Sequence, residues 1–98
     1  MPEEKFMRVA LDQEALRSHS LQERTDIAQR VADALKELGI TILRTSHRGV
    51  SIQVPAAVYE ALGMYDAESN AASLPNDFSD ELSKYVRTVY IPTKPDYY

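Results

Sequence analysis

The sequence predicts a small α+β domain in which an antiparallel sheet carries two helices on one face. Two observations predict this class. Segments with the alternating or β-branched composition of strands are interspersed with segments whose apolar residues recur at helical spacing. Their order along the chain is strand, helix, strand, strand, helix, strand. The chain has 98 residues, enough for one hydrophobic core, so we expect a single domain over residues 1–98.

The first strand is predicted over residues 5–12. Met7, Val9 and Leu11 occupy every second position, which is the period of a strand with one face in the core. The following residues 13–19 are polar and weakly periodic, which indicates a loop or a partial extra turn of helix.

The first helix has a marked start and end. Ser20 and Glu23 have the spacing of a capping box, in which the hydroxyl and the carboxylate satisfy backbone donors at a helix start. Gly39 stands where a left-handed residue commonly ends a helix. The apolar residues between these points form one stripe at helical spacing, made of Ile27, Ala28, Val31, Leu35 and Leu38.

A hairpin is predicted directly after this helix. Residues 40–45 are rich in β-branched side chains, and residues 46–49 have the composition of a turn. In the next strand, Val50, Ile52 and Val54 alternate with Ser51 and Gln53. We therefore expect Ser51 and Gln53 on a sheet face that is solvated or covered by a polar partner.

A second, shorter helix is expected after Pro55, because proline is well tolerated in the first helical turn. Gly63 would end this helix. Its apolar stripe would consist of Ala57, Val58, Ala61 and Leu62.

The last third of the chain divides into three segments. Residues 64–77 have the composition of a mobile acidic loop. Residues 78–91 predict a short helical turn capped at Ser79 and a last strand from Val86. Residues 92–98 are expected to form an extended arm, because Pro92 and Pro95 cannot extend a central strand. With a βαββα core over residues 5–63, the order is βαββαβ, that of the ferredoxin-like sandwich.

Composition and charge exclude several classes of function. The formal net charge is -4 and both signs are interspersed, which argues against nucleic acid as a partner. Residues 49–83 contain no lysine or arginine, so they form either an acidic surface for a basic partner or a solvated loop. The chain has no cysteine, which excludes disulfides and thiolate chemistry. No signal peptide or membrane span is evident, so a cytoplasmic location is expected.

No arrangement of side chains points to an enzyme, a metal site or a cofactor. His19 and His47 are the only histidines, and we expect neither to have a carboxylate or second histidine at the spacing of a helical metal site. Asp80 and Glu81 are adjacent carboxylates in a polar context, which is typical of solvating charges rather than of an acid–base pair. The sequence therefore predicts a non-catalytic protein without metal or cofactor ligands.

Tyrosines crowd the end of a chain that has two phenylalanines and no tryptophan. Such side chains are favoured at interfaces, where the ring buries area and the hydroxyl stays hydrogen-bonded. The alternative is that Tyr85 and Tyr90 pack on the core and the last two are disordered. We predict that a protein partner is bound through the Ser/Gln face and the arm, by Ser51, Gln53, Tyr90, Ile91, Pro92, Thr93, Lys94, Tyr97 and Tyr98.

Several local patterns together resemble a known family. They are a helix ending in Leu38 and Gly39, the run 49–54, and a last strand with Val86 and Val89 at a Val-x-x-Val spacing. In these features residues 31–63 and 86–98 resemble the propeptide and inhibitor domains of subtilisin-like serine peptidases, including sedolisin prodomains. In that family the sheet packs on the peptidase and the arm lies in the substrate cleft. The resemblance implies a propeptide-like inhibitor or a chaperone-like partner of a serine peptidase.

Residues 38–42, a helix end with glycine followed by an isoleucine-rich strand, are also similar to ACT-type regulatory domains. That resemblance implies a small effector bound near the loop after the first strand, and side-by-side pairing of domains. A third possibility is a structural or assembly subunit whose edge strand pairs into a homo-oligomer.

Overall fold

The computed structural model describes residues 4–66, 68–69 and 71–92. In chain order its elements are β1 (Glu4–Leu11), α1 (Leu21–Glu37), β2 (Thr41–Ser46), β3 (Gly49–Pro55), α2 (Ala56–Leu62), β4 (Tyr65–Asp66), β5 (Ala71–Ala72), α3 (Asp80–Ser83) and β6 (Val86–Tyr90). An antiparallel sheet has the strand order β2-β3-β1-β6, and β4 pairs with β5 in a separate hairpin. The described part of the chain is an α+β fold, as predicted.

The centre of the sheet is formed by β1 and β3, and their alternation decides which face is buried. Val9 lies opposite Val50 on one side and opposite Val89 on the other. These three valines are at most 6% exposed, and Met7 and Leu11 of β1 are buried on the same face. Alternating apolar residues therefore place one face of β1 and β3 in the core, as the sequence predicted for residues 5–12 and 50–54.

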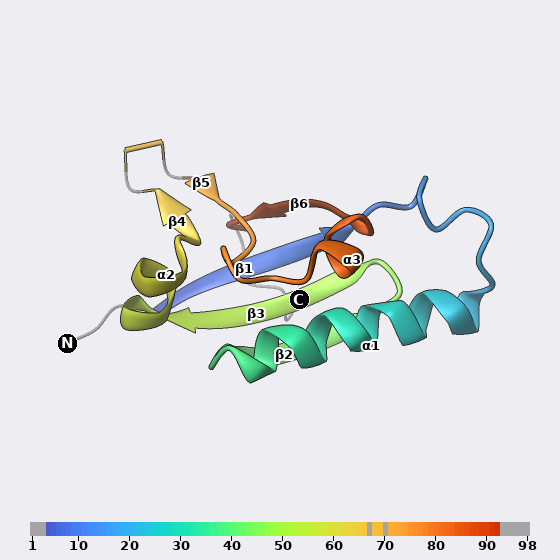
Figure 1. Cartoon of the computed structure of the whole chain (residues 1–98), viewed down its shortest axis with the longest axis horizontal. Helices are drawn as coiled ribbons and strands as arrows, with labels where there is room; N and C mark the ends of the chain where they lie inside the picture. The colour runs from blue at the N-terminus through green and yellow to red at the C-terminus, as the bar shows by residue number, and fades with distance from the viewer. Residues whose placement is uncertain (1–3, 67, 70, 93–98) are drawn as a thin grey trace.

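The first helix, α1, forms where the capping box predicted it. The Ser20 hydroxyl accepts a hydrogen bond from the Glu23 backbone N–H at 3.2 Å, and Glu23 Oε1 accepts one from the Ser20 N–H at 3.0 Å. Gly39 follows the helix with φ of 90°, the left-handed conformation expected there. The helix packs against β2 and β3, and Figure 1 shows it running along the sheet. Its buried residues are Ile27, Ala28, Val31, Ala32 and Leu35.

The connection from β1 to α1, predicted as a loop or an extra turn, is a series of turns that contributes to the core. Leu16 is 0% exposed although its neighbours in sequence, Ala15 and Arg17, are exposed. The Arg24 Nε donates to the carbonyls of Leu16 and His19, at 3.0 Å in both cases, and its Nη2 donates to the carbonyl of Arg17 at 3.2 Å. One arginine of α1 thus satisfies three carbonyl groups of the segment that precedes the helix.

The second helix, α2, begins after Pro55 and ends at Gly63, as predicted, and its expected apolar face is right only for Val58 and Leu62, which are partly buried against the core. Ala57 and Ala61 are exposed, whereas Tyr59 is 7% exposed and contacts Tyr65 edge to face. A tyrosine ring buries far more apolar area than an alanine methyl group, so the helix is oriented with the Tyr59 ring toward the core.

Residues 64–77 were predicted as a loop, and they contain the short hairpin of β4 and β5. Met64 is 0% exposed, and its carbonyl accepts a hydrogen bond from the Ser73 N–H at 2.8 Å. Strands of two residues are too short to show alternation in a sequence, which explains why the hairpin was missed. The helical turn capped by Ser79 and the final strand then follow as predicted, as α3 and β6.

Candidate binding surfaces

The sheet has a second face that carries none of the described helices, which we call the helix-free face. The strand register places Phe6 and Arg8 of β1 on this face, because the intervening Met7 points into the core. Arg8 lies opposite Ser51 on β3 and opposite Tyr90 on β6, so these side chains share the face. It corresponds to the Ser/Gln face expected from the sequence.

Two aromatic side chains on the helix-free face are exposed. Phe6 is 52% exposed and Tyr90 is 42% exposed. They lie on the neighbouring strands β1 and β6, two positions apart in register because Tyr90 pairs with Arg8. Diagonal neighbours of this kind are about 7–8 Å apart, within reach of aromatic side chains. The two rings and the Arg8 stem therefore form one amphipathic strip.

Ser51 was predicted to be solvated or covered by a polar partner, and the solvated alternative is wrong. Ser51 is 4% exposed, and its hydroxyl accepts a hydrogen bond from Arg8 Nη1 at 2.8 Å. Arg8 comes from the adjacent strand and covers the serine, so the pair holds the guanidinium in place on the sheet. Gln53 is half-buried and its side-chain amide donates to the carboxylate of Glu4.

The remaining predicted partner-binding residues follow β6. Ile91 and Pro92 are half-buried, and Ile91 packs against the core. The other predicted residues of the arm lie outside the described residues, namely Thr93, Lys94, Tyr97 and Tyr98.

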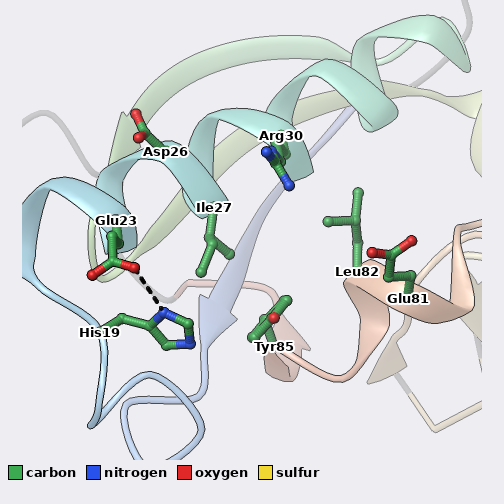
Figure 2. A pocket seen from close by; sticks show the side chains of 8 residues that line it. All are labelled: His19, Glu23, Asp26, Ile27, Arg30, Glu81, Leu82 and Tyr85. Atoms are coloured by element: carbon green, nitrogen blue, oxygen red, sulfur yellow. Dashed lines mark ion pairs between the residues drawn. The ribbon is translucent and has the colours of Figure 1, made fainter.

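On the opposite side of the sheet, a pocket of about 230 Å³ lies between α1 and α3 (Figure 2). Its apolar lining, which we call the apolar floor, is formed by Ile27 of α1, Leu82 of α3 and the ring of Tyr85. Charged and polar side chains surround them, namely His19, Glu23, Asp26, Arg30 and Glu81. We call this site the α1–α3 pocket.

His19 and Glu23 form one end of the α1–α3 pocket. The His19 Nδ1 is 3.6 Å from Glu23 Oε2, and the imidazole contacts the Tyr85 ring edge to face at 6.1 Å between centroids. The pKa of Glu23 lies below its usual value of 4.5, first because its carboxylate accepts the Ser20 backbone hydrogen bond and also because of the Ser20 hydroxyl and His19. Glu23 is therefore already engaged by the helix cap and the histidine.

The expectation that neither histidine has a carboxylate at helical spacing is wrong for His19, because Glu23 lies four residues later and makes this contact. His19 precedes the helix cap at Ser20 and lies outside α1, so its spacing to Glu23 is not part of the helical pattern in the sequence. Within the described residues, no group of three or more potential ligands is placed to hold a metal ion.

Comparison of the chain with protein-family models, with curated proteins and with solved structures gives no match. None of the helices in the described residues is both long and apolar enough to cross a membrane.

Proposed function

We propose that this protein is a non-catalytic protein-binding module that docks through the helix-free face of its sheet. The observation that supports this most is the exposed pair of Phe6 and Tyr90 on that face. Aromatic residues and arginine are enriched at the centres of protein interfaces, where they supply rigid contact area. The hydrogen bond from Arg8 to Ser51 fixes the arginine between the strands, which lowers the entropy lost when a partner binds.

We also infer that the fold is a ferredoxin-like sandwich. In this fold β6 is the fourth strand of the sheet, and the β4–β5 hairpin is an insertion between α2 and β6. The strand order β2-β3-β1-β6 with antiparallel neighbours then supports it, because each edge strand is reached from a central strand through a connection that contains a helix. Within residues 4–66, 68–69 and 71–92, this arrangement leaves one sheet face without helices, which supports docking on that face.

The partner class that we propose is a subtilisin-like serine peptidase, bound by the sheet and by an arm over residues 92–98 as an inhibitor or chaperone-like partner would bind. The resemblance of residues 31–63 and 86–98 to propeptide and inhibitor domains supports this class. Tyr90 stands at the end of β6, where the helix-free face leads into the predicted arm.

An inhibition assay against a panel of subtilisin-like peptidases tests the peptidase version. We expect inhibition of at least one enzyme, weakened about tenfold or more by Phe6→Ser or Tyr90→Ser, which is the loss of a hot-spot contact. Leu21→Ser is the matched control, because Leu21 is 62% exposed but lies at the start of α1. A chain ending at Pro92 tests the arm, and unchanged inhibition would remove the arm from the mechanism. Absence of inhibition across the panel would refute the peptidase version.

Photo-crosslinking tests docking through the sheet independently of enzyme class. A benzophenone amino acid placed at position 6 of the full chain should crosslink to the bound protein, whereas the same group at position 21 should not. Equal crosslinking from both positions would show that the helix-free face is not the docking surface.

A further inference from the structure

We infer that the α1–α3 pocket binds a small zwitterion with a short aliphatic group, a site separate from the proposed protein-binding face. The pocket is about 230 Å³, below the roughly 300–1,000 Å³ of sites for drug-sized ligands, so its occupant is a small metabolite. The inference depends on three features of the pocket, which are its apolar floor, its cation and its unengaged carboxylate.

The apolar floor suits a short hydrocarbon group. Ile27 is 8% exposed and faces Leu82 across the gap between α1 and α3, with the ring of Tyr85 beneath them, as Figure 2 shows. Apolar contact favours binding, and the small size of the floor limits the hydrocarbon to a few carbon atoms.

Charges of opposite sign flank that floor on different elements. Arg30 extends from α1 above the Ile27–Leu82 gap, and Glu81 extends from α3 next to Leu82, on its side away from Ile27 (Figure 2); both side chains line the pocket. Within the described residues neither side chain makes an ion pair, so their charged atoms are more than 4.0 Å apart. A ligand that carries a carboxylate and an ammonium group can contact both, with the carboxylate on the Arg30 guanidinium and the ammonium on the Glu81 carboxylate.

The other charged groups of the pocket do not supply this pair. Glu23 already accepts the Ser20 N–H and faces His19. The Asp26 carboxylate points away from α3 in Figure 2. Lys84 does not line the pocket, and its Nζ lies over the ring of Tyr85, 5.1 Å from the ring centroid. Arg30 would repel a purely cationic ligand, and Glu81 would repel a purely anionic one. The pocket therefore favours a zwitterion over either.

An NMR titration of the 15N-labelled full chain with leucine tests the inference, with leucinamide and 4-methylpentanoate as probes that lack one charge each. Leucine should shift the amide signals of residues 19–30 and 81–85 saturably, with Kd on the order of 1 mM for so small a ligand. Each single-charge probe should bind about tenfold more weakly, because one charge-assisted contact is lost.

Two variants assign the charges. Arg30→Gln should weaken leucine binding about tenfold but should not weaken leucinamide binding, because leucinamide has no carboxylate to lose its contact and its cation no longer faces the Arg30 charge. Glu81→Gln should weaken leucine binding but should not weaken 4-methylpentanoate binding, because this anion has no ammonium group and no longer faces the Glu81 charge. Arg44→Gln and Glu60→Gln are matched controls, since both residues are exposed and neither lines the pocket. Absence of saturable shifts up to about 20 mM, well above the expected Kd, would overturn the inference, as would leucinamide binding as tightly as leucine.

Discussion

Replacing Arg24 with methionine tests how the segment between β1 and α1 is held in place. Arg24 donates three hydrogen bonds to the carbonyls of Leu16, Arg17 and His19, at 3.0–3.2 Å. Methionine keeps much of the aliphatic stem and removes the donors. A hydrogen bond from a charged donor contributes about 1.5–3 kcal/mol. Because Nε is shared between two carbonyls and Arg24 is partly exposed, the three bonds do not add.

We therefore expect Arg24→Met to lower the free energy of unfolding by about 2–3 kcal/mol, a large share of the roughly 5–15 kcal/mol of a typical domain. The corresponding fall in Tm is about 10–20 °C. Urea denaturation followed by circular dichroism measures the loss. Arg30→Met is the matched control on the same helix, and it should stay within about 0.5 kcal/mol because Arg30 is exposed. Equal losses for the two variants would refute the structural role of Arg24.

Three further predictions concern the helix cap and the sheet. Ser20→Ala should cost about 1 kcal/mol in urea denaturation, because the cap loses its acceptor; no loss would show that the cap is unimportant. The lowered pKa of Glu23 means that its contribution to stability is present above pH 4.5 and is lost as pH falls through the folded-state pKa. Glu23→Gln should therefore flatten the acid end of a plot of Tm against pH, and an unchanged plot would contradict this linkage. Gly49→Ala should destabilise the sheet by about 1–3 kcal/mol, since an added Cβ would lie 2.5 Å from the Val9 carbonyl oxygen, and native stability would refute that clash.

The sequence predicted the parts of the fold that depend on neighbouring residues. The capping box of Ser20 and Glu23 involves residues three apart, and the alternation in β1 and β3 follows from the pleat of a single strand. The position of Gly39 marked the helix end because its φ of 90° is costly for residues with a side chain. Each of these features can be read from fewer than ten successive residues.

The binding surfaces could be predicted only in part, because they depend on contacts between distant segments. Ser51 has the alternation of a solvated strand residue, but Arg8, 43 residues earlier, covers it. The α1–α3 pocket brings Ile27 next to Leu82, and nothing in either segment alone indicates that they meet. The aromatic pair was half predicted, since Tyr90 was identified as a candidate and Phe6 was not. Phe6 could have been found from the sequence as a large aromatic residue at a position of β1 whose side chain points away from the core.

The exposed pair of Phe6 and Tyr90 has two physical explanations that stability measurements can separate. Diagonal aromatic neighbours can stabilise a sheet by about 0.2–1 kcal/mol through their mutual contact. In that case both rings serve the fold. If the rings instead serve docking, they contribute mainly to the free energy of binding, when a partner covers them. Their mutual contact then contributes little to the free energy of unfolding of the unbound protein.

A double-mutant cycle of Phe6→Ser and Tyr90→Ser in urea denaturation decides between these explanations. A structural pair would show an interaction energy near the upper end of the range, about 0.5–1 kcal/mol, because the second substitution removes nothing once the first is made. For a docking pair we expect the two losses to add, with an interaction energy below about 0.3 kcal/mol. A strong coupling energy in the unbound protein would mean that the two rings are present to stabilise the sheet. The main support for docking on the helix-free face would then be lost.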